Sequence, residues 1–407
     1  MTEHPLDVDV LVAGAGPAGS ALAALLARNG VSVLAVDRAV FPRDKACSEY
    51  MSPETVRVLS RLGVTDALER AGARAPRGTV VTGVRGARLH GVFEYAGRRP
   101  FRPTGLAISR KILDHELVGT ARRAGAQVLE RTTVEELLYD GGAVAGALVR
   151  DGAGERHSIH ARLTVGADGL RSVVARRIGR RSHGFPRRVA FVAHMAGVED
   201  TGPYAELHVR RSGYIGLNPI GAHHTNVALV VGAHAARRAK GRVGEFFHES
   251  LAEFPAVARR LTRATVVRSI LTTGPFAAWS GRVIASGAAL VGDAADFFDP
   301  FTGEGIYSAL RGAELLAETT LHALDTSGPV AVDRLAPYLR RRRRAFVGKW
   351  LVERMIGYGM SFTNLFDRAV GRLGRRAGMA DTLIGVTGDF VPSREVLNPI
   401  FLARMLV

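Results

Sequence analysis

The stretch that decides the fold reads Val8-Asp9-Val10-Leu11-Val12-Ala13-Gly14-Ala15-Gly16-Pro17-Ala18-Gly19 and continues through an Ala/Leu-rich segment into Val31-Ser32-Val33-Leu34-Ala35-Val36-Asp37. An apolar, β-branched run followed by a glycine-rich turn, a helix-forming segment and a second apolar run predicts strand, turn, helix and strand. Gly-x-Gly-x-x-Gly in the first turn of such a βαβ unit indicates a Rossmann-like domain that binds a dinucleotide.

Each glycine of this first motif has a separate expected task. Gly14 permits the sharp turn, Gly16 lets the backbone approach a pyrophosphate, and Gly19 lets the helix pack closely on the strand. The helix that follows points free N–H groups at the phosphates. The acid that ends the second strand stands where it can bind ribose hydroxyls, and FAD and NAD(P) both remain open. The candidate cofactor-binding residues here are Gly14, Gly16, Pro17, Ala18, Gly19, Asp37 and Arg38.

Length and composition exclude several classes of protein. The chain has 407 residues, which is more than one typical domain, and its 47% hydrophobic and 23% charged content is that of a globular protein. The single cysteine excludes a disulfide framework and suits a reducing cytoplasm. We find no N-terminal signal and no uncharged span long enough for a transmembrane helix, so a cytoplasmic location is expected.

The net charge of +17 limits the kinds of binding partner that are expected. Basic residues are spread over the chain with one cluster, Arg340 to Arg344, and no aromatic-interleaved nucleic-acid module accompanies them. Nucleic acid is therefore not an expected partner. An anionic membrane surface or an acidic carrier protein suits such a surface better.

Strand-rich sequence interrupts the nucleotide-binding pattern twice. Gly78 to Phe101 alternates as strands do, and Val189 to Val231 is mostly strand-like, which predicts a second, antiparallel sheet. Between them, Asp140-Gly141-Gly142 predicts the turn of a β-hairpin over Thr133 to Arg150. Thr265 to Leu271 is expected to form one further strand.

Two more glycine-acid motifs follow apparent strands. They are Gly166-Ala167-Asp168-Gly169, the second motif, and Gly292-Asp293, the third. In this order, separated by strand-rich insertions, the three motifs resemble the FAD-dependent oxidoreductases of the aromatic hydroxylase (group A flavin monooxygenase) and geranylgeranyl reductase superfamily. The resemblance covers nearly the whole chain. It implies non-covalent FAD, with NAD(P)H as a reductant that binds only transiently.

The resemblance also implies how FAD is held. Asp168 lies near the pyrophosphate, Asp293 faces the ribityl chain, Arg110 contacts the cofactor, and the strand around Val134 closes over adenine. The loop from Pro300 to Gly305 starts a helix whose N–H groups can stabilise negative charge on the reduced ring. The other cofactor-binding residues expected are Lys45, Ala46, Cys47, Gly169, Gly292, Pro300, Gly303, Gly305 and Ile306.

The predicted fold class is α/β, with a Rossmann-like FAD-binding domain, an interleaved mixed or antiparallel substrate-binding sheet and a helical C-terminal segment. We place the FAD-binding domain at residues 1–76, 109–179 and 276–340. The substrate-binding domain is placed at 77–108 and 180–275, and the helical segment at 341–407.

The loop from Phe41 to Met51 bears on the chemistry. Its Asp-Lys-x-Cys sequence resembles the geranylgeranyl reductase and halogenase-related branch, where the cysteine lies near the flavin, but Ser48-Glu49-Tyr50 replaces the glycines usual in prenyl reductases. Cys47, Glu49 and Tyr50 are candidate proton donors or substrate-positioning groups. Tyr214 occupies a substrate-domain strand that faces the flavin in this superfamily. A packing cysteine, a solvated glutamate and a packing tyrosine are the alternatives.

Two reactions compete on the reduced flavin. We favour an NAD(P)H-driven monooxygenase that hydroxylates or epoxidises a hydrophobic aromatic, polyketide-like or isoprenoid molecule, because the loop lacks the prenyl-reductase glycines. The alternative is a flavin-dependent ene-reductase of the geranylgeranyl reductase type. A flavin halogenase is less favoured, since Trp279 and Trp350 lie away from the strand where a tryptophan-rich signature is expected. A redox-silent flavoprotein also remains open.

Beyond Arg344 an apolar stripe recurs at helical spacing, opposite Lys349 and Glu353. We expect a helix that packs its stripe against the substrate domain and keeps its charged face in water. The alternative is a helix that lies on an anionic membrane. The stripe consists of Val347, Trp350, Leu351, Met355, Tyr358, Phe362 and Leu365.

Overall fold

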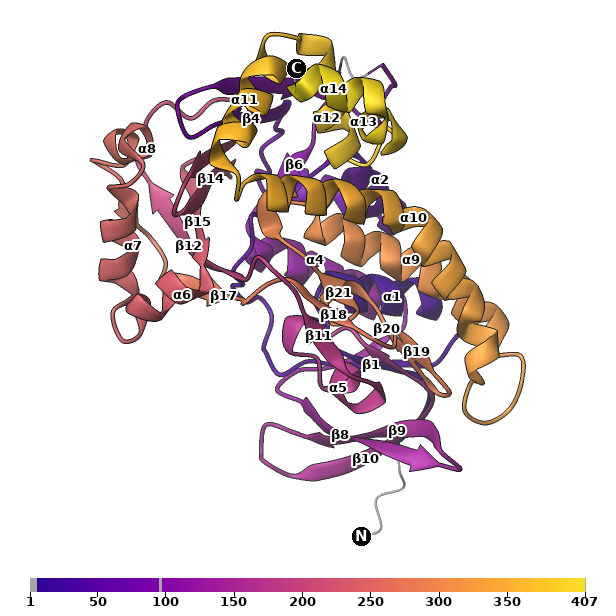
Figure 1. Cartoon of the computed structure of the whole chain (residues 1–407). Helices are drawn as coiled ribbons and strands as arrows, with labels where there is room; N and C mark the ends of the chain where they lie inside the picture. The colour runs from indigo at the N-terminus through magenta and orange to yellow at the C-terminus, as the bar shows by residue number, and fades with distance from the viewer. Residues whose placement is uncertain (1–5, 95–96, 407) are drawn as a thin grey trace.

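The computed structural model describes residues 6–94 and 97–406, which form two large sheets with helices packed on and between them (Figure 1). Five parallel strands make the centre of the first sheet, in the order β20 (Ala288–Leu290), β10 (Arg156–Gly166), β1 (Leu6–Ala13), β2 (Val33–Val36) and β7 (Gln127–Leu129). β19 (Ile284–Ala285) pairs antiparallel with β20, and the hairpin of β8 (Thr133–Asp140) and β9 (Ala143–Arg150) pairs with β10.

The register of this sheet places all three motifs at one edge. Ala13 of β1 is paired with Gly166 of β10, and Gly166 is paired with Leu290 of β20. The motifs follow these adjacent parallel strands, so they leave the sheet side by side at its carboxyl edge, where open α/β sheets bind ligands.

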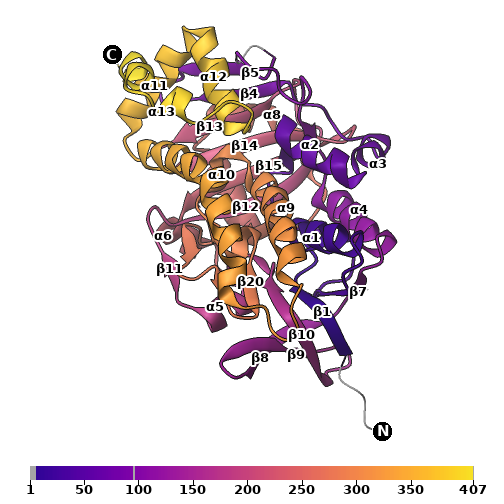
Figure 2. The same ribbon diagram turned by 90° about the vertical axis from the view of Figure 1, so that its right-hand side faces the viewer.

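A layer of helices covers one face of the first sheet (Figures 1 and 2). It contains α4 (Arg110–Arg123), α1 (Pro17–Ala27), α9 (Gly305–Ala323) and α10 (Val332–Gly359), with α2 (Pro53–Leu62) and α3 (Thr65–Arg70) beside them. Leu22, Leu26, Leu310 and Leu335 are fully buried in one apolar cluster that joins these helices to the sheet. On the other face lie α5 (Val173–Ile178) and the β8–β9 hairpin, packed through Val134, Leu137 and Val174.

The second sheet runs in the order β16 (Thr265–Val266), β12 (Arg188–Ala196), β15 (His224–Gly232), β14 (Gly213–Ile220), β13 (Ala205–Arg210), β4 (Gly78–Thr82) and β5 (Arg88–Val92). β17 (Leu271–Thr273) also pairs with β12. The outer face is covered by α6 (Ala233–Ala236), η2 (Arg237–Ala239), α7 (Val243–Leu251) and α8 (Pro255–Arg260). Phe191, Phe246 and Phe247 fill that interface.

Short elements connect the two large sheets. β3 (Tyr50–Met51) pairs with β6 (Leu106–Ala107), and β18 (Ala278–Ser280) pairs with both β11 (Arg181–His183) and β21 (Asp296–Phe297). Single turns of 3-10 helix lie at the second and third motifs: η1 (Gly169–Arg171) begins at the last glycine of the second motif, η3 (Gly292–Ala294) contains the third, and η4 (Pro300–Thr302) follows it. The C-terminal helices α11 (Thr363–Gly374), α12 (Ala377–Thr387), α13 (Arg394–Leu397) and α14 (Pro399–Leu406) lie at the end of the molecule that carries β4 and β5 (Figure 1).

The predicted fold class is confirmed. The prediction of one continuous strand over Thr265 to Leu271 is wrong, because the structure has two short strands, β16 and β17, which each pair with β12 and are interrupted between Val266 and Leu271. In the described residues of the region Gly78 to Phe101, which leave out 95 and 96, strand is confined to β4 and β5. The residue boundaries of the domains stay a prediction, and α10 runs without a break through the boundary placed after residue 340.

The expectation for the C-terminal stripe is also wrong. Lys349 is buried, whereas Val347, Leu351 and Tyr358 are exposed, so α10 turns a lysine inward and part of its apolar stripe outward. The reason is electrostatic, since Lys349 pairs with Asp389, which follows α12 (Ala377–Thr387), and with Glu353 four residues along α10. Helical periodicity cannot reveal partners that are distant in sequence.

Candidate active site

The three glycine-containing motifs contact one another at the carboxyl edge of the first sheet. A side chain at Gly14, whose φ is +99°, would place its Cβ 2.6 Å from the carbonyl oxygen of Ala167. A side chain at Gly292, whose φ is +62°, would place its Cβ 3.1 Å from the Cβ of Ala18. The second and third motifs therefore both lie against the first, and glycine is needed at each contact.

Gly16 and Gly19 differ in their surroundings. A Cβ at Gly19 would lie 1.8 Å from the carbonyl oxygen of Gly14, so this glycine is needed for packing. Among the described residues, a Cβ at Gly16 would have only the Arg43 guanidinium within 4 Å, at 3.7 Å. Gly16 is also the N-cap of α1, and no side chain of the described part caps the helix. The N-terminus of α1 therefore faces a space bordered by an arginine, which suits a pyrophosphate.

Asp37 follows β2 beside this helix terminus. Its Oδ2 accepts a hydrogen bond from Ala15 N at 2.9 Å, and its Oδ1 accepts one from Ala39 N at 2.8 Å. Each carboxylate oxygen keeps a second lone pair. The side chain is thus held in place and can still accept hydrogen bonds from ribose hydroxyls. Arg38, next to it, is exposed.

Cations gather beside the second motif. Arg110, at the start of α4, donates from Nε and Nη2 to the two oxygens of buried Asp114, both at 2.7 Å, and Arg43 lies 3.0 Å from the same carboxylate. Burial lowers the pKa of Arg110, but Asp114 and Cys47 outweigh it and raise the pKa overall. The pKa of Lys45 is lowered by desolvation and by Arg110 and Arg43. One carboxylate thus orients two guanidinium groups, and the net positive charge suits an anionic cofactor.

The acids of the second and third motifs have unused acceptor capacity. Asp168 accepts a hydrogen bond from Val173 N at Oδ2, while its buried Oδ1 has no hydrogen-bond partner among the described residues. Burial raises the pKa of Asp168, and it raises the pKa of Asp293 against the opposing effect of Lys45, Arg110 and Arg181. Groups that are desolvated and incompletely bonded are suited to bind a polyhydroxyl chain. The residues present therefore fit the FAD that the sequence predicts.

The loop that carries Cys47 is fixed to the second sheet. Asn226 of β15 donates from Nδ2 to the Cys47 carbonyl oxygen at 2.6 Å, and Asn218 of β14 donates to the Ser48 carbonyl oxygen at 3.0 Å. These asparagines are directly opposite each other in the sheet. Cys47 itself is half-buried; its Sγ accepts a hydrogen bond from Glu49 N at 3.3 Å and lies near the Arg110 side chain, whose pKa it raises. The loop therefore holds one thiol against one guanidinium.

Glu49 is the second residue after Cys47 in this loop and is 1% exposed, with a φ of +58°. Its Oε1 accepts a hydrogen bond from Arg110 N at 2.9 Å, and its Oε2 lies 2.7 Å from His194 Nε2 and accepts a hydrogen bond from Asn226. With both oxygens engaged, the geometry favours a positioning role. A proton-donor role for Glu49 stays a prediction.

Both candidate tyrosines are buried. The Tyr214 hydroxyl donates to Asp299 Oδ1 at 2.8 Å, and Asp299 in turn caps the Pro300 turn through Phe301 N and pairs with Arg188 at 2.7 Å. Burial, together with Asp299, raises the pKa of Tyr214 well above its ordinary value. Tyr214 thus connects β14 to the proline-glycine loop.

Tyr50 lies under the same loop. A Cβ at Gly303, whose φ is +75°, would lie 2.8 Å from the Tyr50 ring. Burial raises the pKa of Tyr50, and the neighbouring Glu304 adds to the shift. Catalytic roles for Tyr50 and Tyr214 stay predictions, and both side chains support the loop on which the flavin ring is expected to lie.

A buried charge cluster, which the sequence analysis missed, lies behind the proline-glycine loop. It consists of Glu304, Lys349, Glu353 and Asp389. Lys349 Nζ lies 2.6 Å from Asp389 and 3.7 Å from Glu353, and Glu304 Oε2 accepts a hydrogen bond from Ser52 at 3.0 Å. Burial raises the pKa of Glu304 well above its ordinary value and that of Glu353 to about 7. Three acids thus share one buried lysine.

This cluster predicts a pH-dependent stability. The pKa of Glu353 is higher in the folded than in the unfolded chain, so the folded state holds the proton between about pH 4.5 and 7 and stability falls as the pH rises through that window. Glu353→Gln should remove this pH dependence, which amounts to up to about 3 kcal/mol of unfolding free energy between about pH 4.5 and 7. Urea unfolding of the apoprotein at several pH values measures it. An unchanged slope would show that Glu353 does not titrate in this window.

The other residues predicted to bind the cofactor lie in several different parts of the fold. Val134 is buried in the core between the β8–β9 hairpin and the first sheet, and Ile306 is buried between α9 and its neighbouring helices. Ala46 packs beside the second core, and Pro300 and Gly305 are half-buried at the start of α9. Their cofactor contacts stay predictions. Asp114 was missed, although its position four residues after Arg110 on one helix was a usable signal.

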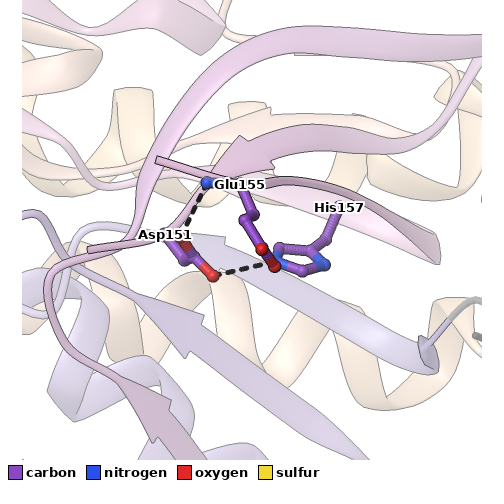
Figure 3. A group of neighbouring side chains, drawn as sticks. All are labelled: Asp151, Glu155 and His157. Atoms are coloured by element: carbon purple, nitrogen blue, oxygen red, sulfur yellow. Dashed lines mark hydrogen bonds and ion pairs between the residues drawn. The ribbon is translucent and has the colours of Figure 1, made fainter. Parts of the chain in front are cut away.

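A second group of side chains lies far from these motifs, on the turn between β9 and β10 (Figure 3). Asp151, Glu155 and His157 bring one possible ligand atom each within 4.8 Å of one another. Asp151 Oδ1 accepts hydrogen bonds from Ala153 N and Glu155 N, and Oδ2 lies 2.9 Å from His157 Nε2. The group is explained by the turn that it stabilises.

A family model described as "FAD binding domain" matches residues 7–351. The chain belongs to this family. It is 26% identical over 406 residues to digeranylgeranylglycerophospholipid reductase of Methanosarcina acetivorans, covering 97% of this chain and 93% of the relative. It is 32% identical over 342 residues to menaquinone reductase of Mycolicibacterium smegmatis, covering 79% and 77% of the two chains. The structure of the myxobacterial chondrochloren halogenase CndH matches with a TM-score of 0.80 and 28% identity, over 88% of this chain and 83% of that one.

The superfamily predicted from the three motifs and the FAD cofactor are thus confirmed, and the protein is an FAD-dependent oxidoreductase. Within residues 6–94 and 97–406, no helix of this oxidoreductase combines the length and apolar character that crossing a bilayer requires.

Proposed function

We propose that this FAD-dependent oxidoreductase reduces a carbon–carbon double bond in an isoprenoid chain, with NAD(P)H as the ultimate reductant. One observation carries the proposal: the loop held by Asn218 and Asn226 presents a single thiol, Cys47, beside the Arg110 guanidinium. The names of the two relatives, both reductases of molecules with isoprenoid chains, support it. Oxygenation, which the sequence analysis favoured, becomes the second candidate.

The chemistry needs a hydride and a proton. When bound, FAD supplies the hydride to one alkene carbon. We assign the proton for the other carbon to the Cys47 thiol, and the Arg110 cation stabilises the thiolate that remains. Asp114 keeps that guanidinium in place through two hydrogen bonds. Because Cys47 is only half-buried, water can return the proton.

Oxygenation remains a candidate because Ser48-Glu49-Tyr50 replaces the glycines usual in prenyl reductases. Anaerobic incubation separates the two. The protein, reduced with NAD(P)H in the absence of oxygen, is given menaquinone or a geranylgeranyl lipid, and products are analysed by mass spectrometry. A product heavier by two hydrogens without oxygen supports reduction. A product that forms only with oxygen and carries its isotope label supports oxygenation.

Replacement of the thiol tests the proton assignment. Cys47→Ala should lower kcat by about 10²- to 10⁴-fold, the usual loss for a missing general acid, while FAD stays bound. Tyr214→Phe is the comparison, because its hydroxyl already donates to Asp299 and its loss should reduce kcat far less. A Cys47→Ala enzyme with full kcat would assign the proton to another group.

A further inference from the structure

The outer surface of α10 and the start of α11 carries large apolar side chains in contact with water. Leu351 is 49% exposed, Tyr358 43% and Phe362 67%. Val347, Leu351 and Tyr358 follow one another at four and seven residues, which places them on one face of α10, and Phe362 lies at the start of α11. We call this the α10 face; its apolar members are Val347, Leu351, Tyr358, Phe362 and Leu365. Contiguous exposed apolar surface of this kind marks an interaction site.

Arginines surround the α10 face. Arg340 and Arg344 extend the same helical row towards the N-terminus, Arg354 lies within it, and Arg343 flanks it, all exposed. The neighbouring acids are engaged elsewhere: Glu353 faces Lys349, and Asp367 of α11 accepts a hydrogen bond from Arg85 N. The face therefore combines apolar residues with positive charge, which is the composition of a helix that lies in the surface of an anionic membrane.

Aromatic contacts join α10 and α11 to the loop of the candidate site. The Tyr358 ring lies 5.7 Å from the Phe298 ring, and Phe366 of α11 lies 6.3 Å from Phe301, both centroid to centroid. A narrow cavity between α10 and the third motif is lined by Phe298, Trp350 and Gly305, among others. Aromatic side chains thus run from the α10 face to the proline-glycine loop.

We infer that the α10 face docks this enzyme on the surface of an anionic membrane, with Leu351, Tyr358 and Phe362 inserted among the lipid headgroups and the surrounding arginines on the lipid phosphates. The docking goes beyond the proposed reaction and does not depend on it. An acidic carrier protein would use the arginines but would leave the exposed leucine and phenylalanine unexplained. Docking by this helix needs no membrane-spanning segment.

Flotation of the purified holoenzyme with vesicles tests the inference. The protein should float with phosphatidylglycerol/phosphatidylcholine vesicles, less so at high salt, and not with phosphatidylcholine alone. Leu351→Ser/Phe362→Ser should weaken binding at least about tenfold, and Arg340→Ser/Arg344→Ser about tenfold or more. The matched controls are Ile400→Ser, an equally exposed apolar residue on α14, and Arg237→Ser/Arg259→Ser beside α6 and on α8. Flavin absorbance and the melting temperature verify that each variant is folded.

Three outcomes would overturn the inference. Absence of flotation with anionic vesicles removes the docking surface, and flotation that both face variants retain places it elsewhere. Binding of an acidic carrier protein without flotation, or a dimer that Leu351→Ser/Phe362→Ser dissolves, assigns the α10 face to a protein partner. Each result is independent of whether the enzyme reduces or oxygenates its substrate.

Discussion

Gly16→Val should yield a folded protein without flavin. Gly16 has φ −71° and ψ −172°, which valine adopts without strain, and its Cβ would meet only the end of the Arg43 side chain among the described residues. The added methyl groups would instead occupy the space expected for the pyrophosphate. Loss of two charge-assisted hydrogen bonds, about 1.5–3 kcal/mol each, corresponds to at least about a hundredfold weaker binding. Titration of the apoprotein with FAD measures the dissociation constant.

Gly19→Val supplies the contrast. A Cβ there would lie 1.8 Å from the Gly14 carbonyl oxygen, so this variant should lose the fold of the βαβ unit together with FAD. Gly244→Ala, in α7 with no atom within 4 Å of the new Cβ, is the neutral control. If Gly16→Val bound FAD as the wild type does, the cofactor would not approach α1 as the first motif predicts.

Lys349→Met should destabilise the protein by about 3–5 kcal/mol near neutral pH, because it removes the cation shared by buried Glu304 and by Glu353 and Asp389, whose side chains are only 14% and 11% exposed. Burial lowers the pKa of Lys349, but Asp389 and Glu353 outweigh it and raise the pKa overall. The lysine side chain is 6% exposed, so water cannot replace it. Without it, Glu304, Glu353 and Asp389 must be protonated or remain buried as uncompensated anions. Urea unfolding gives the change in free energy.

The pH dependence identifies the cause. Protonation neutralises the three acids, so the loss caused by Lys349→Met should shrink as the pH is lowered from 8 towards 5. Lys111→Met, at an exposed position of α4, is the matched control and should change stability by less than about 0.5 kcal/mol. A loss that is independent of pH would point to packing of the lysine stem and not to its charge.

Much of the candidate site follows from local sequence. Turn geometry and close packing demand the glycines at Gly14 and Gly19, and the strands that end at Gly166 and just before Gly292 place the second and third motifs at the same sheet edge. Such features depend on residues close together in the chain and on the rule that parallel strands end together. These local motifs carry the family resemblance from which the superfamily and FAD could be inferred before any coordinates were considered.

The roles of charged side chains did not follow in this way. Glu49 meets His194 and Asn226 across more than 140 residues, and Lys349 meets Asp389 only because α10 crosses the chain that follows α12. From the sequence alone, Glu49 and Lys349 would both be expected to lie in solvent. Burying them costs free energy that only a distant partner offsets.

The sequence by itself therefore determined the α/β fold class, because periodicity and glycine spacing express local backbone requirements, and its three motifs carried the resemblance that identified FAD. Only the tertiary structure decided that Glu49 positions the Cys47 loop, that Lys349 lies inside, and that Leu351 and Phe362 lie outside. The physical reason is that burial and ion pairing depend on which distant segments meet.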